Sequence, residues 1–172
     1  MASMAPELEP PPLGATDLEA AYRTHYGSLV RLASLLVDDV GTCEEIVQEA
    51  FVQVWRRGPA LRTDDGLPAY LRSAVLNGAR SHLRRRQVAR RHLAAVAQPE
   101  SRTEDRTTGD EHRVLAALRS LPRRQREVLA LRYYLDLSEA DIARTLRMSA
   151  GSVKTHAHRG LRALSERLED LR

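Results

Sequence analysis

The sequence predicts an all-α protein made of two small helical domains joined by a flexible linker. Apolar residues recur every three or four positions along most of the 172 residues, which is the spacing of one face of an α-helix. The alternation of apolar and polar residues that marks a half-buried strand is not found. Residues 98–111 separate the two helical parts, because they hold five acids, two arginines, a proline and a glycine and little that can be buried.

Charge and cysteine content narrow the functional classes. The formal net charge of +4 suits a polyanionic partner such as nucleic acid. The single cysteine, Cys43, excludes an intrachain disulfide and indicates a reducing compartment. No apolar run reaches the length of a membrane span, and the proline-rich start lacks the features of a signal peptide. We therefore expect a cytoplasmic protein without a membrane contact.

Two amphipathic helices are predicted after a tail, residues 1–15, that is expected to be disordered. Thr16 with Glu19 and Thr42 with Glu45 have the spacing of a capping box, so a helix is expected to start at each pair. The residues expected to be buried are Leu18, Tyr22, Tyr26, Leu29, Ala33 and Leu36 in the first helix and Ile46, Val47, Ala50, Phe51, Val54 and Trp55 in the second.

A third helix is predicted after a loop at residues 58–66. Pro68 suits its first turn, where the missing N–H costs no hydrogen bond. One side is expected to bury Leu71, Ala74, Val75, Gly78 and Ala79. At about 100° per residue, the opposite side carries Ser73, Asn77, Arg80, Ser81 and Arg84.

The C-terminal part ends in a predicted helix-turn-helix, after two short helices that begin near residue 112 and at Pro122. Ser138 and Ser149 stand where the two N-caps are needed, and Asp141 can complete the first cap. The second helix has an apolar side formed by Val153, Ala157, Gly160, Leu161, Leu164 and Leu168. Its other side is polar and basic, as expected of a helix that enters the DNA major groove.

Three stretches resemble a bacterial RNA polymerase sigma factor of the extracytoplasmic-function (ECF) type, in the sigma-70 family. EEIVQEAFVQVW is similar to the polymerase-binding helix of sigma region 2. YLRSAVLNGARSHLRRR is similar to the helix that melts and reads the −10 element. LPRRQREVLALRYYLDLSEADIARTLRMSAGSVKTHAHRGLRAL is similar to region 4, which reads the −35 element. The resemblance implies region 2 at residues 16–97, a linker at 98–111 and region 4 at 112–172.

The resemblance also implies partners and site residues. Core polymerase would be contacted through the clamp helices of its largest subunit and its flap, and promoter DNA as a duplex at −35 and a single strand at −10. An anti-sigma factor is a candidate further partner. The implied residues are Glu45, Gln48 and Glu49 for core; Asn77, Arg80, Arg84, Arg85 and Arg86 for the −10 strand; Lys154, Thr155, His158 and Arg159 for −35 bases; and Arg144, Arg147, His156 and Arg162 for phosphates.

Four positions depart from the family pattern. Arg147 replaces the usual glycine of the turn, where a positive φ costs a residue with a Cβ about 1 kcal/mol. Ser81 replaces the usual aspartate, so a charge that anchors a neighbouring arginine is missing. His156 and His158 replace commoner residues of the reading helix, so the resemblance does not imply the −35 sequence.

Other functional classes fit the sequence less well. SAGSVKTH is also similar to the reading helix of LuxR-type activators, but those carry an upstream α/β receiver or ligand-binding domain. An enzyme is not expected, because no nucleophile–base pair or metal-ligand pattern is found and no cofactor is implied; His156 and His158 point apart on a helix. A protein that only binds other proteins would not need a basic helix face suited to the DNA major groove.

Overall fold

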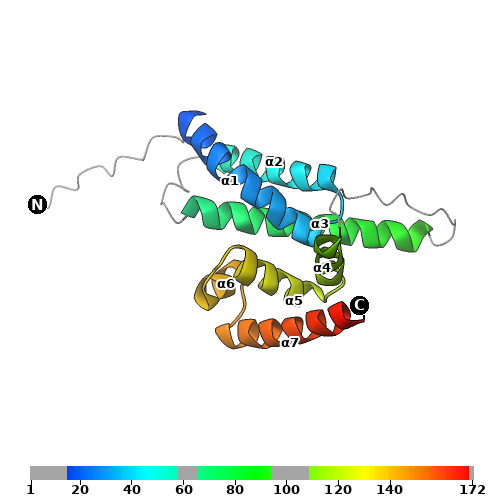
Figure 1. Ribbon diagram of the computed structural model, residues 1–172. Coiled ribbons are helices and arrows are strands. Elements are labelled where there is room, and N and C mark those ends of the chain that lie inside the picture. The colour runs from blue at the N-terminus through cyan, green and yellow to red at the C-terminus, as the bar shows by residue number, and fades with distance from the viewer. Residues whose placement is uncertain (1–14, 58–65, 94–108, 171–172) are drawn as a thin grey trace, which may run out of the picture.

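Seven α-helices and one π-helical segment form the part of the chain that the computed structural model describes, residues 15–57, 66–93 and 109–170 (Figure 1). No strand occurs in these ranges, so the predicted all-α class is confirmed. The elements are α1 (Ala15–Leu36), α2 (Val40–Arg57), α3 (Gly66–Leu93), α4 (Asp110–Arg119), α5 (Arg123–Leu129), η2 (Ala130–Tyr134), α6 (Glu139–Leu146) and α7 (Ala150–Glu169).

Several predicted segments lie outside the described residues. They are residues 1–14 of the predicted tail, 58–65 of the loop and 98–108 of the linker. At their edges, α1 starts at Ala15, α3 starts at Gly66, and α4 starts at Asp110, inside the predicted linker. Among the described residues, no helix is both long and apolar enough to cross a lipid bilayer.

The first three helices pack into one unit around apolar side chains. Leu32, Val47, Leu71 and Val75 are fully buried there, as the helical periodicity requires. Helices α2 and α3 approach closely at Gly78, where an added Cβ would lie 2.7 Å from Ile46 Cγ2. The glycine therefore sets the distance between the helix that carries the candidate polymerase face and the helix that carries the candidate −10 face.

The start of α2 differs from the prediction. The helix begins at Val40, and Asp39 is its N-cap: its Oδ2 accepts a hydrogen bond of 2.6 Å from the N–H of Thr42. Thr42 is thus the capped residue, and the proposed capping box of Thr42 with Glu45 is wrong. Aspartate is among the preferred N-cap residues. Glu45, freed from a capping role, lies exposed on the helix surface.

Removing this cap should destabilise the fold in a pH-dependent way. Asp39→Ala is expected to lower the free energy of unfolding by about 1 kcal/mol at neutral pH. The hydrogen bonds from the Thr42 side chain and backbone lower the pKa of Asp39. The charged Asp39 carboxylate therefore makes its full contribution to the free energy of unfolding above the pKa of the unfolded state, about 3.9. This contribution is lost as the pH falls through the lower pKa of the folded state.

Denaturant titrations at neutral and acidic pH test this expectation. Asp39→Asn is the matched control, because asparagine is an N-cap of similar strength that does not titrate. The difference between wild type and Asp39→Ala should shrink at acidic pH, whereas that between Asp39→Asn and Asp39→Ala should not. A wild-type advantage that is the same at both pH values would contradict the role given to the carboxylate.

The second half builds a helix-turn-helix on a short support. Helix α7 packs against α5, and Gly160 allows this, since an added Cβ would lie 3.1 Å from Leu129 Cδ1. Both predicted caps are confirmed: Ser138 Oγ accepts from the N–H of Asp141, and Ser149 Oγ from that of Ser152. The Asp141 carboxylate bonds to the Ser138 hydroxyl, however, and not to the backbone N–H of the cap.

The two halves lie against each other, which the sequence did not indicate. Figure 1 shows α5, α6 and α7 along one side of the α1–α3 unit. One buried apolar cluster continues from α1–α3 into η2, α6 and α7. Three hydrogen bonds to carbonyls of α1 join the halves. The Arg119 guanidinium donates twice to Ser34 O, at 2.9 and 2.6 Å, and Tyr134 Oη donates to Ser28 O at 3.2 Å.

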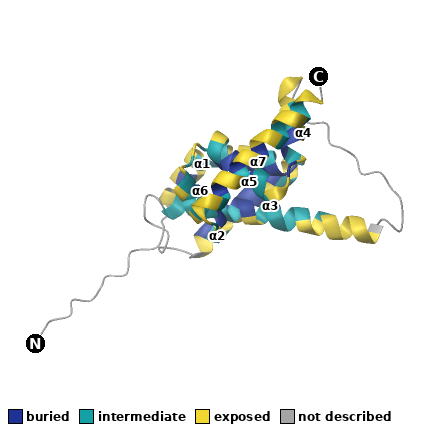
Figure 2. Cartoon of the chain, turned by 90° about the horizontal axis from the view of Figure 1, so that it is seen from below, coloured by how far each residue is buried: buried dark blue, intermediate teal, exposed yellow. Residues whose placement is uncertain are grey.

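Burial otherwise follows the predicted stripes, with a few differences. Trp55, predicted to be buried, is 54% exposed, and Tyr22 and Leu161 are also exposed. Leu76, which was not predicted, is fully buried in α3. The C-terminal turns of α3 project beyond the body of the molecule and are coloured as exposed in Figure 2.

Candidate nucleic-acid interface

Helix α7 presents a polar face to solvent over a buried apolar back. Lys154, Thr155, His158 and Arg159 are all exposed, while Val153, Ala157 and Gly160 are buried. Lys154 Nζ lies 3.7 Å from Glu139 Oε2 at the start of α6. The Thr155 hydroxyl donates to Gly151 O at 3.0 Å, which leaves its oxygen lone pairs available. The four predicted −35 residues are thus brought together on one surface.

The turn before α7 contains a residue in the left-handed conformation that is not a glycine. Arg147 has φ 53° and ψ 56°. The N–H of Met148 bonds to Ala143 O at 3.0 Å and that of Arg147 to Arg144 O at 3.3 Å, which is the Schellman arrangement for a helix C-terminus. The turn therefore has the backbone geometry for which glycine is usual, and Arg147 retains the strain of the positive φ.

Arg147→Gly should raise stability while weakening DNA binding. Glycine relieves the left-handed strain of about 1 kcal/mol. It also frees the unfolded chain by about 0.4–1 kcal/mol, so the free energy of unfolding should rise by no more than about 0.5 kcal/mol. The matched control is Arg147→Ala, which loses the charge and keeps the Cβ. A lower stability of Arg147→Gly than of Arg147→Ala in thermal denaturation would show that the turn carries too little strain to offset the entropy that glycine adds to the unfolded chain.

The predicted phosphate contacts are not equivalent. Arg144 is exposed and hydrogen-bonded to Asp141, and the pKa of Asp141 is lowered first by its bond to Ser138 and then by Arg144. Arg162 is exposed and lies 3.2 Å from Glu166. His156 is half-buried, and its Nδ1 is buried without a hydrogen-bond partner among the described residues. It is therefore the least suited of the four to reach a phosphate.

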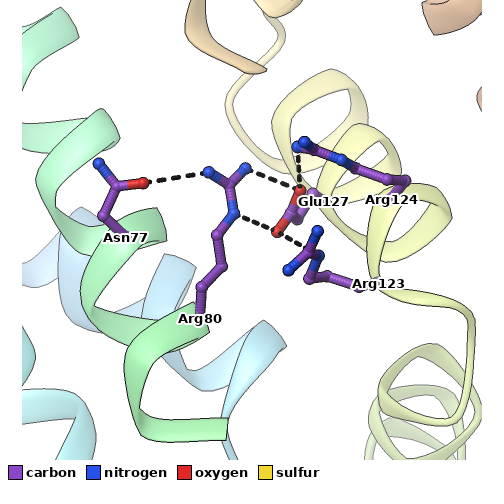
Figure 3. A network of polar contacts seen from close by, with 5 residues as sticks. All are labelled: Asn77, Arg80, Arg123, Arg124 and Glu127. Carbon is purple, nitrogen blue, oxygen red and sulfur yellow. Dashed lines mark hydrogen bonds and ion pairs between the residues drawn. The ribbon is translucent and has the colours of Figure 1, made fainter. Parts of the chain in front are cut away.

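The candidate −10 face on α3 is engaged by the other half of the chain. Asn77 is exposed, and Arg80 donates to its Oδ1 at 3.1 Å. The same guanidinium makes two bonds to the Glu127 carboxylate of α5, Nε to Oε1 at 2.7 Å and Nη2 to Oε2 at 2.8 Å (Figure 3). Arg80 is therefore not available to DNA in this conformation.

The arginines near the end of α3 differ in their contacts. Arg84 and Arg85 are exposed. Arg86 instead forms an ion pair of 2.5 Å with Asp38 at the α1–α2 junction. Burial raises the pKa of Asp38, but the hydrogen bond and charge of Arg86 outweigh it, so this pKa lies below its ordinary value. Arg84 and Arg85 are the better candidates for phosphate contacts.

The outer face of α2 carries the predicted polymerase residues. Glu45, Gln48 and Glu49 are all exposed. Val52 and Trp55, 40% and 54% exposed, lie on the same side of the helix. The sequence analysis did not predict that Val52 and Trp55 belong to this face. The position of Trp55, about 100° around the helix from buried Val54, could have indicated that it is exposed.

A cleft of about 1340 Å³ lies between these faces and α6. One wall carries Glu45, Glu49 and Gln53 of α2 together with Asn77 and Arg85 of α3. The facing wall comes from the helix-turn-helix and includes Asp141, Arg144 and Arg147. Among the described residues, no group of three or more His, Cys, Asp or Glu side chains is placed to hold a metal ion.

The two halves match two family models. Residues 21–89 match Sigma-70 region 2, and residues 111–164 match Sigma-70, region 4. Together these ranges cover more than half of the chain. The chain is a sigma factor of the sigma-70 family.

Curated relatives place this sigma factor in the ECF group. It is 31% identical over 155 residues to the RNA polymerase sigma-E factor of Streptomyces antibioticus, a match that covers 89% of this chain and 85% of that protein. It is 32% identical over 165 residues to the ECF RNA polymerase sigma factor SigL of Mycobacterium tuberculosis, covering 91% and 92%. As a sigma factor, it binds core RNA polymerase and directs it to promoters.

Solved structures agree with the fold of this sigma factor. The sigma factor RpoE of Bartonella quintana, solved in complex with the anti-sigma factor NepR, superposes with a TM-score of 0.75 at 21% identity, over 90% of this chain and 98% of that one. CnrH, solved with the cytosolic domain of CnrY, gives 0.66 at 22%, over 91% and 90%. The LuxR-type alternative is not supported, because the first half matches region 2 of sigma factors.

Proposed function

We propose that three faces of this sigma factor divide the work of initiation. The α2 face docks on the clamp helices of the largest polymerase subunit, the α3 face reads the −10 strand, and the α7 face reads the −35 duplex. The observation that carries the proposal is that α2 and α7 each expose a contiguous polar face that their own packing does not use. Region 4 also meets the flap of the polymerase, which keeps α7 over the −35 duplex.

At the −10 element, Asn77 is the base-reading residue. Its amide both donates and accepts, so it can pair with the edge of a base that has left the stack. Arg84 and Arg85 hold the phosphates of the separated strand on the projecting end of α3. With Arg80 released from Glu127, its guanidinium joins them. Only 4% of the residues are aromatic, so binding of the single strand depends on polar and basic groups more than on base stacking.

At the −35 element, α7 enters the major groove. Lys154 and Arg159 donate to guanine edges, and Thr155 and His158 bond to adjacent bases. Arg144, Arg147 and Arg162 contact phosphates and set the register. A bidentate contact to guanine discriminates by about 1–3 kcal/mol, whereas a phosphate contact adds affinity without sequence preference.

At the polymerase, Glu45 and Glu49 bond to basic residues of the clamp helices while Val52 and Trp55 bury apolar area beside them. Tryptophan is enriched among residues that dominate the energy of interfaces. The protein acts in the cytoplasm, where polymerase and promoters are found, and without catalysis of its own. An anti-sigma factor is a further proposed partner, and the cleft that joins the α2 and α3 faces is where it would block both.

Site-specific photo-crosslinking in the promoter complex tests this assignment. A photoreactive residue at Gln48 should crosslink to the largest polymerase subunit, at Ser81 to the non-template strand near −10, and at His158 to the −35 duplex. Glu169, exposed at the far end of α7, is the control position and should give none of these products. A Ser81 or His158 product on the polymerase instead of DNA would contradict the division proposed.

A further inference from the structure

Lys154, on the proposed −35 reading face of α7, has an acidic neighbour on another helix. Glu139 stands in the first turn of α6, and its Oε2 lies 3.7 Å from Lys154 Nζ. This separation is that of an ion pair but is longer than a hydrogen bond. The ammonium N–H groups therefore remain available to a further acceptor. An acceptor and a donor thus stand side by side at the edge of the reading face.

A second cation fixes the position of Glu139. Its Oε1 accepts a hydrogen bond of 3.2 Å from Arg132 Nη1 of η2. The Arg132 guanidinium lies 5.9 Å from the centre of the Tyr133 ring, within the range of a cation–π contact. The side chain of Glu139 is 33% exposed and that of Lys154 is 69% exposed. The carboxylate is therefore held by η2, while the lysine is free to reach a base.

The fold alone gives little reason for a carboxylate at this place. The dipole of α6 favours an acid in its first turn, but Asp141 already supplies one there. A carboxylate beside DNA also repels the phosphates, so it lowers the affinity for every DNA sequence. Unfavourable groups of this kind are one way in which an interface rejects the wrong partner. Glu139 is therefore a candidate for sequence discrimination.

The Glu139–Lys154 pair is complementary to one base pair. In the major groove, guanine presents the acceptors O6 and N7, and cytosine presents the N4 amino group as a donor. Lysine donates to the guanine acceptors, and glutamate accepts from cytosine N4. Glu139 Oε2 and Lys154 Nζ lie close enough together to meet both edges of a single G·C pair. The reversed pair would oppose donor to donor and acceptor to acceptor.

We propose that Glu139 is a specificity-determining residue of the −35 interface and that it reads the cytosine paired with the guanine that Lys154 reads. This inference rests on the proposed −35 role of α7. The carboxylate acts mainly against wrong sequences, because it rejects the reversed pair and weakens non-specific binding. Its removal should raise the affinity for DNA in general and reduce the preference for one orientation of one base pair.

The test is equilibrium binding of the full-length protein, assembled with core polymerase, to promoters that differ by one base pair within −35. Glu139→Ala should reduce discrimination between G·C and C·G at one position by about five- to tenfold, the value of roughly one base contact. Lys154→Ala should reduce discrimination at the same position. Because both side chains contact one base pair, the double variant should lose less than the two single losses combined.

Two further variants complete the design. Glu139→Gln should reduce the same discrimination by only about two- to threefold, because its amide can accept from cytosine but can also donate to guanine. It carries the test if circular dichroism shows that Glu139→Ala does not fold. Glu166→Ala is the matched control. It breaks the exposed ion pair with Arg162 at 3.2 Å and should change the base preference at no position.

The inference and the proposed function can fail separately. If the Glu139 variants shift the affinity for every −35 sequence by the same factor, or relax a position other than that of Lys154, the inference is wrong and the proposed function stands. If the wild type shows no preference among the −35 variants, the proposed function itself is wrong, and the inference falls with it.

Discussion

Reversing Glu45 and Glu49 together to lysine is expected to weaken binding to core polymerase about a hundredfold, or about 2.8 kcal/mol. Two attractions become repulsions against a basic partner surface, and like charges opposed across an interface cost several kcal/mol. The fold should be unaffected, because both side chains are exposed and neither caps α2. The measurement is equilibrium binding to purified core, with circular dichroism on the same samples.

Glu19→Lys with Glu169→Lys is the matched control. It makes the same change in net charge at two exposed positions outside the proposed docking face. The control should bind core within a few-fold of wild type at physiological salt, because its charges act only through the long-range field. If both double variants lose the same affinity, net charge and not the α2 face determines binding.

Arg159→Ala is expected to lower transcription by an amount that depends on the −35 sequence. If Arg159 reads a guanine, the loss is about 1–3 kcal/mol on promoters that carry that base and far less on the others. Arg85→Ala removes a proposed phosphate contact. It should weaken all promoters about equally and reduce the slope of log affinity against log salt by roughly one.

A small library of −35 variants, transcribed with each mutant and with wild type, separates the two roles. Both residues are exposed arginines, so each controls for the charge lost in the other. A uniform loss for Arg159→Ala across the library would make it a phosphate contact. A base-dependent loss for Arg85→Ala would move part of the reading function to the end of α3.

Local patterns in the sequence predicted most of the secondary structure. The caps at Ser138 and Ser149, the all-helical class and the exposed face of α7 followed from spacing and side-chain chemistry. The same reasoning misplaced the start of α2, because Thr42 and Asp39 both suit an N-cap and only the backbone decides between them. Trp55 was assigned to the core by its hydrophobicity, against its helical angle.

Contacts between distant segments could not be predicted in this way. The bond between Arg80 and Glu127 joins residues 47 apart, and neither sequence neighbourhood indicates the other. Periodicity places Arg80 on the polar side of α3 but does not say whether that side meets DNA or region 4. The partner of Arg80 in the folded chain, and that of Arg86, required the three-dimensional arrangement.

The most direct test is transcription by core polymerase with and without this protein on a library of genomic fragments, with every start site mapped. We expect start sites that appear only when the protein is added, each preceded by one shared pair of sequence elements near −10 and −35. Asn77→Ala should reduce all of them. A start-site map identical to that of core alone would contradict the assignment of these faces to promoter recognition.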